Sequence, residues 1–392
     1  MQLGVRMKKC RRFLFFWGMI MIALSLPEMR ACASEKKESG AEFDYIDRWL
    51  KSNDLSQVNE GMDSLFPGME IDSGQMLVMI MEGNAPQAFK MFAEQVKDGL
   101  FGELSGLRQI FIYILVLGVV SALFAEFSDL FAGGQLAQSG FYFLYLFLMV
   151  ILTKVILFVS ETATQAVENI VLFVKLFVPT YCVAVGAAQG AASGVYYYQF
   201  MLIVAYLVES FLSSVMVPFI FSYVMLALLN GFWTEEKLTL LLDFIEKGIG
   251  LALKVAMGAI TGLSLVQAVI VPVASGLRIS AMRKAVSAIP GIGGVTEGVA
   301  ELVLGSAVLI KNSMGVLLFI VLFGACLTPL LKILIVTATV KLGAAITGIV
   351  SDKRISLCAD RVGGGCFLFL RCVCTSMILF MIVVAVASYT IS

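Results

Sequence analysis

Long runs of apolar residues dominate this sequence and most constrain how the chain can fold. A helix needs about 20 consecutive apolar residues to cross the hydrocarbon core of a bilayer. Eight runs of roughly this length are present: 110–130, 141–159, 170–188, 200–230, 249–273, 314–331, 333–350 and 367–391. Hydrophobic residues make up 59% of the 392, and the mean hydropathy is +0.93. The sequence therefore predicts an all-α, polytopic membrane helical bundle of about eight spans.

The chain contains no histidine. This excludes Ser-His-Asp and Cys-His nucleophilic systems, His-ligated zinc and HExxH metalloprotease helices. Cys358, Cys366, Cys372 and Cys374 match no standard zinc spacing, so we interpret them as small apolar residues. Acidic and basic residues are equal in number, at 28 each, and there is no basic arm for nucleic acid. We therefore expect no enzymatic activity, no cofactor or metal, and no nucleic-acid partner.

The first 33 residues have the pattern of a secretory signal peptide. A positively charged start precedes a short apolar region at 13–26, and Ala31-Cys32-Ala33 supplies the small residues of a cleavage site after Ala33. A lipoprotein site at Cys32 fits less well because Arg30 stands close before it. An uncleaved anchor is the other alternative, although the apolar region is short for a span. Residues 34–107 are mixed in polarity and predict a small extracytoplasmic helical region that caps the spans.

A half-apolar stretch at 275–313 separates a first membrane block, 108–274, from a second, 314–392. Its first part, 277–289, has one apolar helical stripe with basic residues largely off it. A basic amphipathic helix beside membrane spans usually lies in the headgroup layer on the cytoplasmic side. We therefore expect a cytoplasmic amphipathic hairpin with a basic first arm and an acidic second arm, hinged by proline and glycine. Its predicted residues are Arg278, Arg283, Lys284, Pro290, Gly291, Gly293, Gly294, Glu297 and Glu301.

Charges in the connecting segments predict the orientation. With residues 34–107 outside, eight spans place the basic segments 275–313 and 351–366 both inside, and the acidic loop 160–169 outside. The 231–248 loop has mixed charges and favours neither side. Pro218 can kink or split the long run 200–230, which would change this parity. The connection at 331–333 is very tight, so the runs 314–331 and 333–350 could instead form one broken helix plus a re-entrant piece.

Several ionisable residues lie within or at the edges of the apolar runs. Such groups tend to face a bundle interior or water, which favours a polar pathway or a subunit contact, with Glu209 and Lys254 as one possible pair. The alternative is that the lysines extend from span ends toward the headgroups. The predicted intramembrane polar residues are Lys154, Lys175, Glu209, Lys254 and Lys341, and Lys332 lies at a boundary.

Glycines at four-residue spacing allow close helix approach in membranes. Gly258 and Gly262 have this spacing within the fifth apolar run, and we expect them to pack against another helix. A second such series, at 186–194, also fits a glycine-rich loop.

The basic helix followed by AIPGIGGVTEGVAELVLGSAVLIKNSMGV resembles the stage III sporulation protein AE family of endospore-forming bacteria, and the resemblance extends over the whole chain. It implies a component of a channel complex between mother cell and forespore, in the mother-cell membrane around the forespore. The implied partners are other stage III sporulation membrane proteins, a forespore-anchored protein and the lipid bilayer. It supplies no catalytic residues. From the residues alone, a stand-alone permease for a small solute is the alternative, although no internal repeat is visible.

Overall fold

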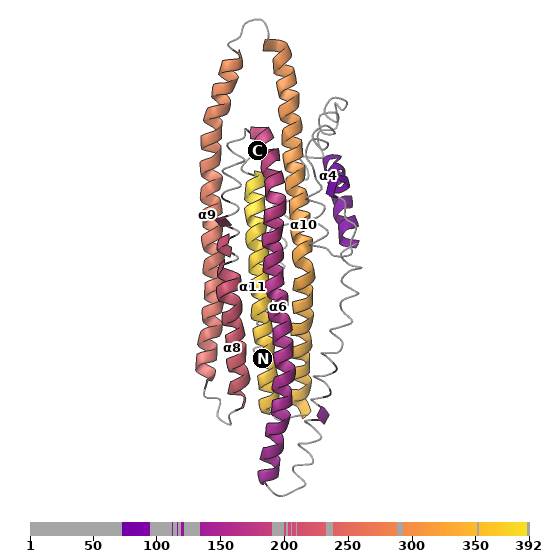
Figure 1. The fold of residues 1–392 in the computed structure, drawn as a ribbon, viewed down its shortest axis with the longest axis vertical. Helices are drawn as coiled ribbons and strands as arrows, with labels where there is room; N and C mark the ends of the chain where they lie inside the picture. Colours follow the sequence, from indigo (N-terminus) through magenta and orange to yellow (C-terminus); the bar gives the residue numbers. More distant parts are fainter. Residues whose placement is uncertain are drawn as a thin grey trace.

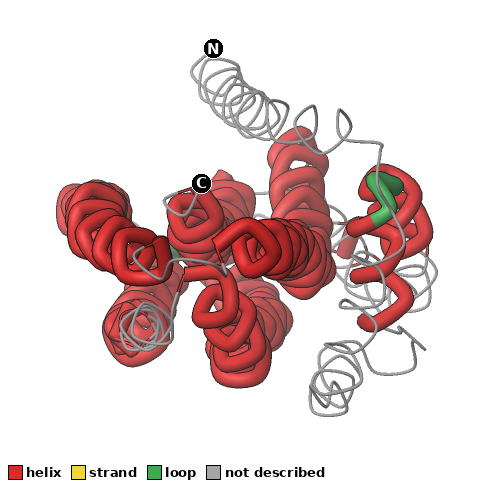
Figure 2. The backbone as a smooth tube through the Cα atoms, turned by 90° about the horizontal axis from the view of Figure 1, so that it is seen from above, coloured by secondary structure: helices red, strands yellow, loops and turns green. Residues whose placement is uncertain are grey.

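The computed structural model describes residues 73–94, 134–189, 210–232, 238–287, 293–350 and 353–389, with single positions at 112, 116, 119, 120, 200, 203, 204 and 206–208. These residues are helical apart from short turns, and none of them is in a strand (Figure 2). The all-helical prediction is confirmed for this part of the chain. The predicted signal peptide and the first apolar run lie outside it, except for four positions of that run.

The long helices lie side by side as an elongated bundle (Figure 1). Helix α11 contacts α6, α8, α9 and α10, so it is the helix around which the others pack. Figure 1 draws α9 and α10 on opposite sides of α11. The elements are α4 (Ser73–Met81), α6 (Gly134–Gln189), the π-helical turn η1 (Leu212–Met216), α8 (Val217–Asn230), α9 (Thr239–Ser287), α10 (Gly293–Val350) and α11 (Lys353–Tyr389).

Four described segments are long and apolar enough to cross a membrane: Tyr142–Phe173, Tyr206–Asn230, Asn312–Gly348 and Arg354–Ile382. This supports a membrane protein. It does not reproduce the predicted set of spans, because the structure joins runs that the sequence separated. The run 249–273 lies within α9, which is a continuous helix through residue 287.

Helix α6 joins the second and third predicted spans, so the predicted outside loop 160–169 is wrong. Buried residues follow one another at alternating spacings of three and four along α6, which is the pattern of coiled-coil packing. They are Tyr145, Leu148, Leu152, Val155, Val159, Thr162, Ala166 and Phe173. Thr162 Oγ1 donates to the Phe158 carbonyl at 2.8 Å, and Thr164 Oγ1 donates to the Ser160 carbonyl at 3.0 Å. The helix itself therefore satisfies both hydroxyls.

Helix α10 joins the two predicted spans 314–331 and 333–350 and continues through Pro329. A proline inside a membrane helix is tolerated when neighbouring groups satisfy the freed carbonyl. Because α10 makes one pass instead of two, its ends lie at opposite ends of the bundle (Figure 1). The prediction that 275–313 and 351–366 share the inside is therefore wrong. The two basic segments cannot both satisfy the positive-inside rule, so charge alone no longer fixes the orientation.

Residues 353–366, which we predicted to be part of a loop, form the first turns of α11. Ile355, Cys358, Ala359, Val362 and Cys366 are buried at helical spacing. The apolar period of the last predicted span therefore begins about four turns earlier than its hydropathy indicates.

The irregularity expected at Pro218 is a π-helical turn at Leu212–Met216, directly before α8. Proline has no amide hydrogen and its ring crowds the preceding turn. A widened turn accommodates this without breaking the helix.

Helix α4 ends in a Schellman-type cap. Gly83 has a φ of +82°, and the Gly83 and Asn84 amides donate to the Ile80 and Met79 carbonyls at 3.1 and 2.9 Å. The chain then turns into a second helical segment, 85–94.

This pair of helices packs on α10 (Figure 1). The Phe89 and Phe323 rings lie 6.3 Å apart, and the Phe92 ring occupies the space that a side chain at Gly324 would need. Phe323 and Gly324 lie inside the candidate span 312–348. Residues 73–94 therefore lie alongside a spanning helix, whereas we expected this region to cap the spans from outside.

Candidate functional site

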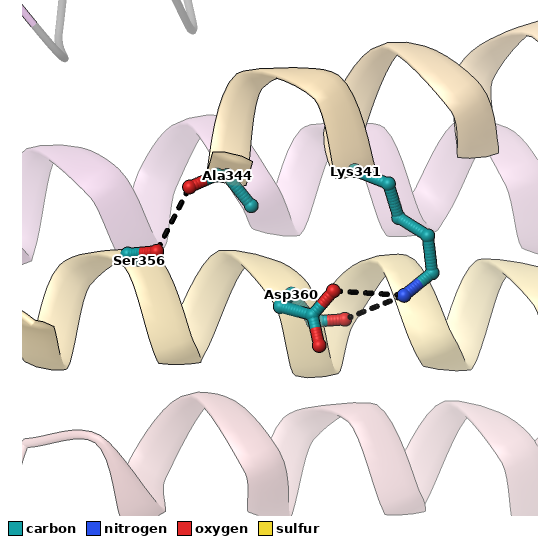
Figure 3. A network of polar contacts seen from close by, with 4 residues as sticks. All are labelled: Lys341, Ala344, Ser356 and Asp360. Carbon is teal, nitrogen blue, oxygen red and sulfur yellow. Dashed lines mark hydrogen bonds and ion pairs between the residues drawn. The ribbon is translucent and has the colours of Figure 1, made fainter. Parts of the chain in front are cut away.

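Two ion pairs on neighbouring residues of α11 connect it to the helices on either side. On one side, Lys341 Nζ of α10 lies 2.9 Å from Asp360 Oδ1 and 3.5 Å from the Asp360 carbonyl oxygen (Figure 3). About one turn away, Ser356 Oγ donates to the Ala344 carbonyl at 2.8 Å. Asp360 and Ser356 lie four residues apart, on one face of α11, and both bind α10.

On the other side, Arg361 Nη1 lies 3.8 Å from Asp243 Oδ1 of α9. Arg361 is 22% exposed and Asp243 is 54% exposed. Glu246, one turn after Asp243, lies close to Tyr223 of α8. The acidic residues near the start of α9 therefore face Arg361 of α11 and Tyr223 of α8.

A buried tyrosine connects three helices near the same end. The Tyr145 hydroxyl of α6 donates to the Leu228 carbonyl of α8, and its oxygen lies 3.1 Å from Cys358 Sγ of α11. A side chain at Gly231 would overlap this hydroxyl. Tyr145 and Phe232 also make an edge-to-face contact with ring centroids 5.9 Å apart. The end of α8 is thus held at a fixed height against α6 and α11.

Two glycines bring α11 close to its neighbours. A Cβ at Gly363 would lie 2.7 Å from Lys341 Cγ, and one at Gly365 would overlap Val224 of α8. A Cβ at Gly364, between them, would have no atom within 4 Å. Glycines on two faces of α11 therefore allow α10 and α8 to pack closely against it.

These polar groups connect neighbouring helices. No group of three or more His, Cys, Asp or Glu that could hold a metal ion occurs among the residues that the structure describes. The hollow beside this cluster is small and is lined by Asn230, Gly231, Arg354 and Arg361 among others. The cluster can hold α8, α9, α10 and α11 at fixed positions along one another.

The predicted hairpin falls partly outside the described residues. Arg278, Arg283 and Lys284 lie in α9, and Gly293, Gly294, Glu297 and Glu301 lie in α10, but their side chains are not described. Pro290 and Gly291 lie outside the described residues. The pairing of the basic and acidic arms thus stays a prediction. The last residues of α9 and the first residues of α10 lie at the same end of the bundle (Figure 1).

The predicted intramembrane polar residues have different settings. Lys341 is paired with Asp360, as described above. Lys154, Lys175 and Lys254 are exposed, and the described part of the chain gives none of them a hydrogen bond or an ion pair. Lys332 is partly buried and does interact. Glu209 lies outside the described residues, so its suggested pairing with Lys254 has no test.

Gly258 and Gly262 have no packing partner among the described atoms of the chain, because a Cβ at either would have nothing within 4 Å. Their predicted role in helix packing therefore stays a prediction about contacts beyond the described residues.

Sequence reasoning missed Asp243, Asp360, Arg361 and Arg371. The first three were assigned to loops, and the helical period of their apolar neighbours was the signal that could have placed them on helices. Arg371 lies in the middle of α11, with its guanidinium nitrogens 3.8 and 3.9 Å from where a Cβ of Gly250 on α9 would be. A charge within an apolar run was visible in the sequence.

Comparison with known proteins gives two matches and no solved structure. The family model described as Stage III sporulation protein AE matches residues 71–390. The Stage III sporulation protein AE of Bacillus subtilis (strain 168) is 20% identical over 263 residues. That alignment covers 67% of this chain and 66% of the relative, so the chain spans slightly less than two thirds of the relative's length. Because the family model covers most of the chain, this protein belongs to the stage III sporulation protein AE family.

Proposed function

We propose that this chain is an integral membrane component of the channel complex that joins mother cell and forespore during sporulation. Family membership over residues 71–390 carries the proposal, because it assigns a sporulation role. The four apolar helices support it, because they fit a protein embedded in a membrane. The interhelical pairs at Asp360 and Arg361 fit a structural subunit, whose task is to keep helices in register. The stand-alone permease is not favoured by the family assignment.

The proposed location is the mother-cell membrane that surrounds the forespore. Deleting the gene in its own host should abolish heat-resistant spores after engulfment, with loss of late forespore gene expression. A fluorescent fusion that restores sporulation should concentrate around the engulfed forespore. Normal spore counts in the deletion strain would contradict the proposal, as would uniform fluorescence over the whole cell membrane.

We propose further that the hairpin 275–313 anchors the chain to other proteins of the complex. Its support is the basic set at Arg278, Arg283 and Lys284, together with its place at one end of the bundle (Figure 1). Cationic side chains at the rim of an interface guide association with acidic partners. Reversing Arg283 and Lys284 to Glu should reduce recovery of the complex in pull-downs from sporulating cells. The matched control, Arg283→Lys with Lys284→Arg, keeps the charge and should keep recovery at the parent level. Equal recovery from both double variants would overturn the anchoring role.

A further inference from the structure

The outward face of α6 carries charges that hydrocarbon cannot solvate. Lys154, Glu161, Glu168 and Lys175 are spaced seven residues apart, about two helical turns, so they lie on one face. All four are exposed, and none has a partner in the described part of the chain. Any stretch of about 20 residues starting between 142 and 162 includes at least two of them. Charges in a membrane face water or a partner, so this face is not covered by lipid alone.

The outward face of α9 has a complementary character. Lys254 is exposed beside Leu251 and Val255, which are 63% and 61% exposed. Gly258 and Gly262 follow on the same face, with open space where a Cβ would be. This face therefore presents one cation that has no partner among the described residues, next to a strip of glycines that lets another helix approach closely.

Glu161 and Lys254 lie at the same height in the bundle. Tyr145 of α6 touches Cys358 of α11, and Arg361 of α11 pairs with Asp243 of α9, which fixes the three helices relative to one another. Glu161 follows Tyr145 by 16 residues, Lys254 follows Asp243 by 11, and Arg361 follows Cys358 by three. At about 1.5 Å per residue, the two positions differ in height by about 3 Å.

We infer that this chain binds a second copy of itself through these two faces, with Lys254 of one copy paired to Glu161 of the next. Helices α6 and α9 run in the same direction along the bundle (Figure 1). Copies related by rotation about an axis normal to the membrane keep their heights, so the two charges lie at matching heights wherever the α6 face of one copy meets the α9 face of the next. The faces belong to different helices, so the contact is head-to-tail and leads to a ring or an open chain of copies.

The glycines explain how the remaining lysines stay apart. Lys154 and Lys247 would also share a height, and like charges repel. Helices that cross at small residues diverge at about 40°, so contact is confined to the crossing point. Lys247 lies 11 residues before Gly258, about 16 Å below such a crossing. At the height of Lys247 the two helices have separated by about 10 Å, so Lys247 and Lys154 do not meet. Lys254 is only one turn below Gly258, where the helices are still close enough for it to pair with Glu161.

Disulfide cross-linking in native membranes tests the contact. Two differently tagged full-length chains, one with Glu161→Cys and one with Lys254→Cys, are co-expressed and oxidised. A dimer carrying both tags is expected at about tenfold or more over the parent chain, which retains its native cysteines. Each variant expressed alone should give no disulfide-linked dimer above the level of the parent chain. Phe147→Cys, on the same face of α6 but two heptads lower, is the matched control and should not cross-link to Lys254→Cys.

Exchanging the two charges tests whether Glu161 and Lys254 interact directly or only lie near each other. Glu161→Lys and Lys254→Glu should each reduce the oligomer seen with a lysine-independent cross-linker, and the double variant should restore it. Three results would overturn the inference: no mixed dimer, a dimer from either single-cysteine variant alone, or a product in which the second chain is a different protein. None of these results bears on spore formation, so the self-contact and the sporulation role can fail independently.

Discussion

Helices α9 and α11 carry the same kinds of residues in opposite settings. Both are long and apolar, and both contain several glycines and charged side chains. On α11, Gly363 and Gly365 face other helices, and Asp360 pairs with a cation of α10. On α9, Gly258 and Gly262 face open space, and Lys254 has no partner in the described chain.

The same sequence feature therefore has different roles in the two helices. A glycine or a charge in an apolar run shows that a close contact or a polar partner is needed, but not in which molecule. For α11 the chain itself supplies the partner. For α9 the described part of the chain supplies no partner, which is the basis of the proposed contact between copies.

The largest effect is expected at Gly365. Replacing it with Leu forces a branched side chain against Val224, a stiff residue that cannot move aside, and overpacking of this kind costs about 3 kcal/mol. The variant should unfold at a much lower temperature in detergent, as followed by dye labelling of buried thiols such as Cys358 and Cys372 during heating.

Gly364→Ala is the matched control, because a Cβ there would have nothing within 4 Å. It should unfold at the parent temperature or slightly above, since alanine favours the helix. Equal losses at both positions would show that α11 is not packed through Gly365.

A smaller effect is expected at Tyr145. Changing it to Phe keeps the ring but removes the hydroxyl that contacts the Leu228 carbonyl and Cys358. Losing a buried hydrogen bond and leaving its acceptor unsatisfied costs about 1 to 2 kcal/mol. The same thermal labelling assay should show a clear downward shift. Tyr206→Phe, at a position that is 69% exposed, should show none.

The pair between Lys341 and Asp360 should contribute less. Both side chains are partly exposed, at 36% and 44%, so solvent screens their attraction. Lys341→Asp and Asp360→Lys should each destabilise the bundle, and the double variant should recover about 0.5 to 1 kcal/mol of coupling. If the double variant loses as much stability as the two single variants together, the pair does not hold α10 to α11.

The sequence was sufficient for the class of the fold, because runs of about 20 apolar residues have few alternatives to membrane helices. It was not sufficient for the connections. Ala163, Ala166 and Val167 are buried at helical spacing between two apolar runs, yet Glu161 and Glu168 made this segment resemble a loop. Helical period, weighed above mean hydropathy, would have joined those runs.

The partners of the polar residues could not be predicted in the same way. Lys341 was identified because a lysine in an apolar run is unusual, but Asp360 is 19 residues away and on another helix. Which helices are neighbours depends on packing across the whole bundle. Close contacts such as Gly365 with Val224 determine that packing, and no spacing within α11 reveals them.

The smallest effect on the isolated chain is expected at Lys254, and it gives the sharpest contrast with Lys341. Lys254→Met removes a charge that has no described partner, so the unfolding free energy of the detergent-solubilised monomer should change by less than about 0.5 kcal/mol. Lys341→Met removes a charge that is paired, and leaves Asp360 without its cation. Thermal labelling of both variants, at a dilution where the parent is monomeric, should therefore rank Lys341→Met below Lys254→Met. The reverse order would mean that Lys254 stabilises its own chain, and the contrast between α9 and α11 would not hold.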